Sequence, residues 1–210
     1  VLALAERLEL FKMDELIWNN PCKAPAPIQW ASKTRQQLNT AYESIYWFTN
    51  NPKAVDADNR RVLEPHTERH KRLIERGGAA AANYSDGAYR RREGAFSRPT
   101  EGRIPRNVLR YPHNCQSQKA YKESAKALGL PTHGAPYPLA LALFLIRFLT
   151  REQDLVVDPF AGSFTTPLAA EMADCRWVAT DCMWEYGRGG MERFRDRPGF
   201  EANPAFLQSA

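Results

Sequence analysis

The stretch that decides the fold reads Leu155-Val156-Val157-Asp158-Pro159-Phe160-Ala161-Gly162-Ser163-Phe164-Thr165-Thr166. Three apolar β-formers at its start predict a strand that is buried on both faces. Pro159 is expected to end this strand because proline has no N–H to give to a sheet, and Gly162 lets the backbone come close to a ligand. The hydroxyl side chains that offer caps for a helix over residues 167–172 are Ser163, Thr165 and Thr166. A strand that breaks into a glycine turn before a helix indicates a cofactor site.

A second short strand is predicted over residues 176–181, and it ends in Asp181. In the βαβ unit that results, the ligand lies beyond the carboxyl ends of the strands, where an acid can accept hydrogen bonds from ribose hydroxyls. The glycine turn matches neither the dinucleotide pattern Gly-x-Gly-x-x-Gly nor the triphosphate pattern Gly-x-x-x-x-Gly-Lys-Ser/Thr. A nucleoside ligand without phosphates therefore fits the turn better.

An apolar helix is predicted over residues 139–149, and its Leu- and Ala-rich sequence is typical of a helix buried against a sheet. A leader that contains His133, Tyr137 and Pro138 comes directly before it. Taken alone, His133 is an ordinary loop histidine. Because the leader is stiffened by prolines and its helix runs into the cofactor strand, we expect His133 and Tyr137 to line the cofactor pocket.

The composition is that of a packed α/β domain with an insertion, since the chain has 210 residues and 43% of them are hydrophobic. The longest apolar run, residues 139–149, is too short to span a bilayer. Four cysteines are scattered without a Cys-x-x-Cys pair, which fits reduced thiols in a cytoplasmic protein, and no metal is expected. His66 and His70 are spaced for one helix face, which we interpret as a solvated face because the glutamate between them does not follow a zinc-protease order.

Positive charge is concentrated in one region of the chain. Residues 58–110 carry thirteen Lys or Arg against seven Asp or Glu, a local net charge of +6 in a chain whose total is +5. Few large apolar residues occur there, so the region is predicted to be an insertion or a small separate module. Such clusters are often only solvated surface, but beside a group-transfer site they are expected to neutralise nucleic-acid phosphates. The aromatic side chains among the arginines are Tyr84, Tyr89 and Phe96, which either contact bases or pack the module.

The N-terminal part predicts a helix and then a strand over residues 1–19, followed by a strand over residues 41–49 that completes a hairpin at a sheet edge. A further helix is predicted over residues 117–128 and ends at Gly129. The first residues of the chain read as the middle of an amphipathic helix without the basic region of a signal peptide. We therefore expect the start of the chain to be an internal cut.

At this point the residues resemble DNA amino-methyltransferases of the beta arrangement, whose usual string is Asp-Pro-Phe-x-Gly-Ser-x-Thr-Thr. The leader motif of the same family matches His133-x-Ala135-x-Tyr137-Pro138-x-x-Leu141. Other segments resemble N4-cytosine enzymes of restriction-modification systems, among them Ile17-Trp18-x-Asn20-Pro21-x-Lys23-x-Pro25-x-Pro27-Ile28, Ala57-Asp58-Asn59-Arg60-Arg61-Val62-Leu63 and Gly102-x-Ile104-Pro105-x-Asn107-x-Leu109. Departures from the pattern are Phe164, Gly134 and the run Cys182-Met183-Trp184.

The resemblance implies a Rossmann-like sheet, incomplete in this chain, with S-adenosylmethionine as cofactor and double-stranded DNA as partner. The cofactor residues it implies are His133, Tyr137, Pro138, Asp158, Pro159, Phe160, Gly162, Ser163, Thr165, Thr166 and Asp181. The DNA-binding candidates are Arg35, Arg60, Arg61, Lys71, Arg72, Arg90, Arg91 and Arg92. The implied division is a catalytic half over residues 1–54, a target-recognition region over 55–115 and a cofactor half over 116–210.

The activity implied is methyl transfer to the N4 amino group of cytosine by a prokaryotic or phage-encoded enzyme, and a cognate restriction endonuclease is a partner the resemblance allows. Members of the family use a Ser/Asn/Asp-Pro-Pro-Tyr/Phe loop to orient the target amine, and no such string occurs here. We therefore assign no catalytic residue and expect this chain to be inactive alone. The alternatives are an adenine-N6 enzyme, a non-catalytic DNA-binding remnant and an unrelated nucleotide-binding enzyme.

Overall fold

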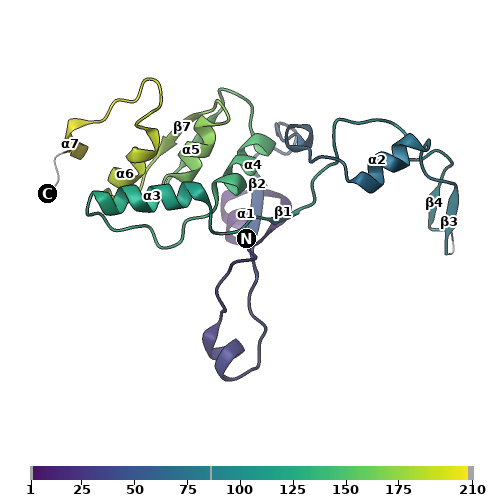
Figure 1. Ribbon diagram of the computed structural model, residues 1–210, viewed down its shortest axis with the longest axis horizontal. Helices are drawn as coiled ribbons and strands as arrows, with labels where there is room; N and C mark the ends of the chain where they lie inside the picture. Colours follow the sequence, from purple (N-terminus) through teal and green to yellow (C-terminus); the bar gives the residue numbers. More distant parts are fainter. Residues whose placement is uncertain (1, 86, 208–210) are drawn as a thin grey trace. The chain divides into compact units, whose positions relative to one another are not determined.

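The computed structural model describes residues 2–85 and 87–207, and it divides the chain into two compact units (Figure 1). The first, which we call the core unit, comprises residues 1–57 and 106–210. The second, the inserted unit, comprises residues 58–105. The basic region predicted over residues 55–115 thus encloses the inserted unit.

The first sheet of the core unit is built on the predicted N-terminal hairpin. Helix α1 (Leu2–Leu8) leads into β1 (Phe11–Asn19), which pairs in antiparallel fashion with β2 (Tyr42–Thr49). Strand β5 (Val108–Arg110) adds to the other side of β1 in parallel, which gives the order β2-β1-β5. The loop between β1 and β2 holds a π-helix, η1 (Ile28–Lys33).

The second sheet is the predicted βαβ unit. Strands β6 (Leu155–Asp158) and β7 (Arg176–Ala179) are parallel and are joined through helix α5 (Thr165–Glu171). The strand ends before Pro159, as predicted. Burial of β6 on both faces is wrong, because Leu155 is 52% exposed and Val157 is 61% exposed. Their side chains point away from α5, and alternation along a strand puts them both on the face that no described element covers.

Helices α3 (Gln116–Ala127) and α4 (Leu139–Leu149) form where the sequence predicts them. Three further elements follow β7, namely α6 (Trp184–Met191), η3 (Glu192–Phe194) and α7 (Pro204–Leu207). Helix α5 begins at Thr165, two residues before the predicted start. Its N-cap is Phe164, which has no side-chain acceptor, so the predicted capping by hydroxyl groups is also wrong.

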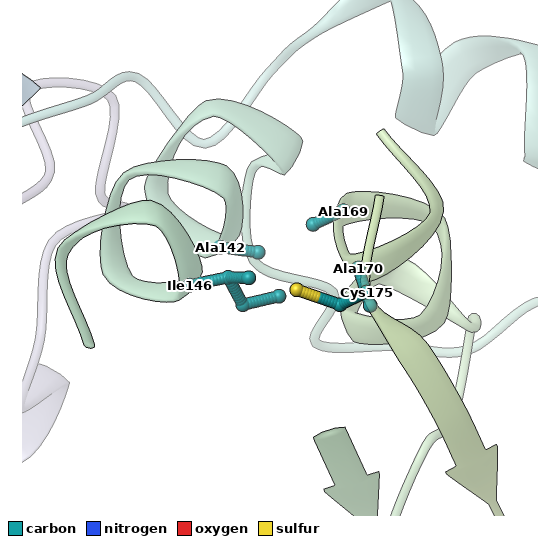
Figure 2. Packing of buried hydrophobic residues seen from close by; sticks show 5 residues of the cluster. All are labelled: Ala142, Ile146, Ala169, Ala170 and Cys175. Atoms are coloured by element: carbon teal, nitrogen blue, oxygen red, sulfur yellow. The ribbon is translucent and has the colours of Figure 1, made fainter. Parts of the chain in front are cut away.

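Helix α4 packs on both parts of the core unit. On one side Ala142 and Ile146 meet Ala169, Ala170 and Cys175, which come from α5 and the turn after it (Figure 2). On the other side Leu141 joins a second apolar cluster with residues of the β1 sheet, Leu16, Trp18 and Leu109. Small side chains at the α4–α5 contact allow the two helices to approach closely. The cofactor strand is therefore held against a rigid core.

The inserted unit is small, and backbone hydrogen bonds hold its two ends together. It contains η2 (Asn59–Val62), α2 (Glu68–Glu75) and a hairpin of β3 (Ala82–Tyr84) and β4 (Tyr89–Arg91). Its two ends meet in an antiparallel bridge between Glu64 and Arg103, whose backbones exchange hydrogen bonds of 2.8 and 3.0 Å. A β-carbon on Gly102 would lie 2.6 Å from the carbonyl oxygen of Glu64, so this close approach requires glycine.

The two histidines do not share a helix face as predicted, because α2 begins at Glu68 and His66 lies before it. Their rings stack with centroids 4.6 Å apart, and the Nε2 of His66 bonds to Thr100. Within residues 2–85 and 87–207, no group of three His, Cys, Asp or Glu side chains is arranged to hold a metal ion. No helix in that part of the chain is long and apolar enough to cross a bilayer.

Candidate functional site

The turn after β6 is held from both ends by hydrogen bonds. The carboxylate of Asp158 accepts a 3.0 Å bond from the peptide N–H of Phe160, and the N–H of Ala161 donates to the carbonyl of Thr180 at 2.9 Å. Gly162 follows with φ +49°, and Phe164 also has a left-handed backbone, with φ 58°. Two left-handed residues so close together fold the chain tightly into the start of α5.

Asp181 closes this turn from the segment after β7, which ends at Ala179 and not at Asp181 as predicted. Its carboxylate accepts a 2.9 Å bond from the N–H of Met183 and a 2.7 Å bond from the N–H of Gly162. These two donors, in that order of effect, lower the pKa of Asp181, and the positive field of His133 acts in the same direction. The side chain of Cys182 is a third hydrogen-bond partner of this carboxylate. An ionised carboxylate has about four acceptor sites, so it can still accept a hydrogen bond from a ligand hydroxyl.

His133 lies directly against the glycine turn, as its predicted role requires. A β-carbon on Gly162 would be 3.0 Å from both Cδ2 and Nε2 of the imidazole. The ring meets Tyr186 of α6 edge-on, with centroids 5.0 Å apart, and its Nδ1 is buried without a partner. A buried polar atom without a partner beside a turn that only glycine fits is what a nucleoside-type cofactor would satisfy. The residues present therefore fit such a group.

The hydroxyl groups predicted as helix caps belong instead to a buried polar network. The hydroxyl of Tyr137 bonds to that of Thr166, and the Ser163 and Thr165 hydroxyls lie 3.0 Å apart. The amide of Gln118 in α3 donates to the carbonyl of Tyr137 at 2.6 Å. Burial raises the pKa of Tyr137, so its hydroxyl stays protonated and can donate. This network ties the leader before α4 to the first turn of α5.

Arg193 is a residue of the site that the sequence does not reveal. Its Nε donates to the carbonyl of Ser163 at 2.7 Å, and its Nη1 donates to the hydroxyl of Ser117 at 2.6 Å. The guanidinium lies over the ring of Tyr121, 5.1 Å from its centroid, and burial lowers the pKa of Arg193. The hydroxyl of Tyr121 in turn accepts a bond from the N–H of His133. Arg193 thus contacts Ser163, the neighbour of Gly162, and Tyr121, which holds the backbone of His133.

The structure separates the predicted cofactor residues into three groups. His133, Gly162 and Asp181 form the open cradle described above. Pro138, Tyr137, Ser163, Thr165 and Thr166 lie behind it, buried or half-buried. Phe160 is 86% exposed, next to Pro159 and Asp158 at the end of β6, so its ring is free to contact a ligand.

A separate cavity of about 470 Å³ lies on the face of the sheet that α5 covers. Its walls come from β7, α6 and the C-terminal segment, and include Phe164, Trp177 and Phe194. None of the eleven predicted cofactor residues lines it. The open cradle, rather than this apolar cavity, has the polar groups that a nucleoside needs.

The predicted DNA-binding residues differ in how far their charge is already neutralised. Arg60 pairs with Asp58 at 2.6 Å, and Lys71 pairs with Glu68 at 2.7 Å. Arg35 lies in the loop between β1 and β2 and is exposed. The remaining candidates belong to the inserted unit and are Arg61, Arg72, Arg90, Arg91 and Arg92.

Comparison with known proteins identifies relatives over nearly the whole chain. Residues 1–192 match a family described as DNA methylase, with members that act at N6 or N4 positions. The chain is 32% identical over 198 residues to the type II methyltransferase M.PvuII of Proteus hauseri, covering 93% of this chain and 58% of that protein. It is 38% identical over 74 residues to M.HindIII of Haemophilus influenzae, covering 35% of this chain and 23% of that protein.

Solved structures agree with the sequence matches. The cytosine-N4-specific PvuII DNA methyltransferase superposes with a TM-score of 0.66 and 26% identity, over 98% of this chain and 58% of the other. A complex of M1.HpyAVI with S-adenosylmethionine gives a TM-score of 0.52 at 17% identity, over 91% of this chain and 66% of that one, which shows a shared fold. The chain thus spans 58% of the length of M.PvuII, and the expected α/β methyltransferase fold is confirmed.

Proposed function

Because the chain belongs to the N6/N4 family of DNA methylases, we propose that it supplies the cofactor-binding half of an enzyme that methylates cytosine N4 in double-stranded DNA. The observation that carries this proposal is the cradle in which Asp181 and His133 meet at the Gly162 turn. The methyl donor we propose is S-adenosylmethionine, which carries its methyl group on a sulfonium and releases it to a nucleophile.

In this proposal the chain's own residues bind and align the donor. Asp181 accepts hydrogen bonds from the ribose through its remaining acceptor sites, and the Nδ1 of His133 gains the partner it lacks. Phe160 offers an exposed π-face beside the turn, which attracts a cation such as a sulfonium. Alignment of this kind lowers the barrier because the reacting groups are already oriented.

The methyl acceptor we propose is the exocyclic amine of a base turned out of the duplex. The amine forms a bond to the methyl carbon while the carbon–sulfur bond breaks, and the amine then loses one proton to water. Cytosine N4 is favoured over adenine N6 because M.PvuII, the relative matched over most of the chain, is cytosine-N4-specific. The inserted unit supplies the DNA contacts, and a cognate restriction endonuclease is the further partner that type II relatives suggest.

We further propose that turnover needs a Pro-Pro-Tyr or Pro-Pro-Phe loop, which the 210 residues do not contain. Such a loop would hold the flipped base, so the chain alone would bind cofactor and DNA without methylating. The second candidate is a DNA-binding remnant, which the basic inserted unit favours. The two differ in one property, because a remnant has no need of the cofactor.

The test is calorimetric titration of S-adenosylmethionine into the full chain, with circular dichroism to confirm folding. Saturable binding that is lost in Asp181→Ala supports the methylase half, whereas a folded chain that binds DNA but no cofactor supports the remnant. To identify the methylated base, the chain is joined to a segment that contains the Pro-Pro-Tyr or Pro-Pro-Phe loop, and the joined protein is allowed to methylate DNA. The nucleosides of that DNA are then distinguished by mass. N4-methylcytosine supports the proposal, and N6-methyladenine contradicts it.

A further inference from the structure

The excess positive charge of the inserted unit is not spread evenly over its surface. Three of its cations are paired with carboxylates of the same unit, namely Arg60 with Asp58, Lys71 with Glu68 and Arg103 with Glu64. A cation that is already paired must share or give up its carboxylate to bind a further anion, so it contributes less to that binding. Arg69, Arg76 and Arg91 are not among these pairs.

Three arginines without a carboxylate partner in the described part of the chain line one cleft of about 600 Å³. Arg69 and Arg76 come from α2 and its C-terminal end, and Arg91 comes from β4. The other residues of the cleft are Thr67, His70, Leu73, Gly78, Ala79, Ala80 and Phe96. None of the residues that line it is acidic, and Glu75 lines a neighbouring hollow instead.

Two of these guanidinium groups are already fixed in place. The Nε of Arg91 donates to the carbonyl of Ala80 at 2.9 Å, and the Nε of Arg76 donates to the carbonyl of Arg72 at 3.2 Å. In both cases the two terminal nitrogens keep their donors for another group. A guanidinium that is held in this way loses less side-chain entropy when it binds an anion, and its fork matches the two oxygens of a phosphate.

The backbone of the cleft is equally constrained. A β-carbon on Gly78 would lie 2.6 Å from the carbonyl oxygen of Gly94, and Ala79 forms a β-bridge with Ala95. The bridge keeps the floor of the cleft closed and places the exposed ring of Phe96 at its edge. An aromatic ring beside fixed cations is a combination that nucleic-acid sites use.

We propose that this cleft binds backbone phosphates of duplex DNA through Arg69, Arg76 and Arg91. The inference rests on the proposed function and deepens it, since it assigns the phosphate contacts to one built site. Of these three residues, the sequence singles out Arg91 alone. Arg60 and Lys71, which the sequence also favours, contribute little because carboxylates already hold them.

The test is fluorescence anisotropy of a labelled duplex with the full chain over a series of salt concentrations. Each phosphate contact contributes about 0.9 to the slope of log K against log salt. For Arg76→Ala/Arg91→Ala we therefore expect a slope that is smaller by about 1.8 and a binding constant at least about tenfold weaker at low salt. Lys119→Ala is the control, because this exposed cation pairs with Glu123 in α3 and does not line the cleft, and its slope should equal that of the parent chain.

A second variant separates charge from geometry and serves if the alanine variant does not fold by circular dichroism. Arg76→Lys/Arg91→Lys keeps both charges but loses the planar fork, so the slope should remain while the affinity falls several-fold. A slope unchanged in the alanine variant, or an affinity unchanged in the lysine variant, would overturn the phosphate site and leave the proposed function standing. A parent chain that binds S-adenosylmethionine but no DNA would instead remove the DNA part of the proposed function. Inorganic phosphate that binds the cleft while the DNA slope stays unchanged assigns the site to a free anion and also overturns the inference.

Discussion

The ring of Phe164 fills the space that a β-carbon on Gly190 would need, since that carbon would lie 2.5 Å from Cδ2 and 2.6 Å from Cγ of the ring. Phe164 itself has a left-handed backbone, with φ 58°. The large side chain after Ser163 is therefore matched by the absence of a side chain on α6. The two positions act as a pair.

The contact between Phe164 and Gly190 predicts that alanine has different effects on stability at Gly190 and at Gly189. Gly190→Ala should lower the free energy of unfolding by about 1–3 kcal/mol, because the ring must be displaced from a packed site. Gly189→Ala should be neutral or stabilising by up to about 1 kcal/mol, since its β-carbon would make ordinary contacts of 3.5 Å inside a helix. Urea unfolding of both variants measures the difference. Adding Phe164→Gly should recover part of the loss in Gly190→Ala, and strict additivity of the two changes would contradict the pairing.

A second prediction concerns the glycine turn. Gly162→Ala combines a strained backbone with a β-carbon 3.0 Å from the His133 ring, so we expect it to displace the imidazole and to abolish cofactor binding. Gly129→Ala has a positive φ but no atom within 4 Å, so it measures strain alone, about 1–2 kcal/mol. Gly134→Ala has neither feature and should match the parent. Calorimetry measures the cofactor affinity of the three variants, and thermal unfolding measures their stability. Equal losses of cofactor affinity in all three would show that His133 plays no part.

A third prediction concerns Asp181 and pH. Asp181→Asn keeps the shape but removes the charge that two N–H donors stabilise, so we expect at least about a tenfold loss of cofactor affinity, in line with about 1.5–3 kcal/mol for a charged hydrogen bond. Asp196→Asn, an exposed change outside the turn, should have no effect.

The pKa of Asp181 is lowered in the folded chain, so its stabilisation is fully present above the ordinary value of 3.8 and is lost as the pH falls through the lower folded value. Stability measured as a function of pH should therefore fall more gently on the acid side in Asp181→Asn. An equal loss of stability at acid pH in the variant and in the parent would contradict this role.

A fourth prediction concerns Arg193. Arg193→Met removes the donors that Ser163 and Ser117 use, and we expect a loss of about 2–4 kcal/mol in unfolding free energy together with weaker cofactor binding. Arg193→Lys should restore part of both, because it keeps one donor group and the charge. Arg195→Ala is the control, since the Arg195 side chain is exposed and Glu192 keeps its pair with Arg188. Added guanidinium ion at millimolar concentration should restore cofactor binding to Arg193→Ala, and a variant that is destabilised with unchanged cofactor affinity would make Arg193 purely structural.

Local sequence patterns account for much of this fold. The hairpin, the βαβ unit and α4 follow from apolar periodicity and from Pro159, all of which act over a few residues. Helix α6 is not visible in the sequence because Gly187, Gly189 and Gly190 give it a low helix propensity. Gly189 and Gly190 are explained only by the tertiary packing, because α3 lies against the first and the Phe164 ring against the second.

In the polar site, too, the sequence reveals the residues that have a local signal and misses those that depend on distant partners. Asp181 and Gly162 can be found from strand and turn signals alone. Arg193 cannot, because its partners Ser163 and Ser117 lie 30 and 76 positions away in the chain. The exposed face of β6 is a further example, since an apolar strand shows its preference for burial but not which neighbours cover it.

The bridge between Glu64 and Arg103 has a consequence for how such proteins diversify. Because the two strands of the chain meet there, the stretch from residue 65 to 101 is tied off at a single neck, and neither the pairing of β1 with β5 nor the cofactor turn belongs to it. If this stretch makes the DNA contacts as proposed, recombination can exchange it as one cassette and change those contacts in a single event.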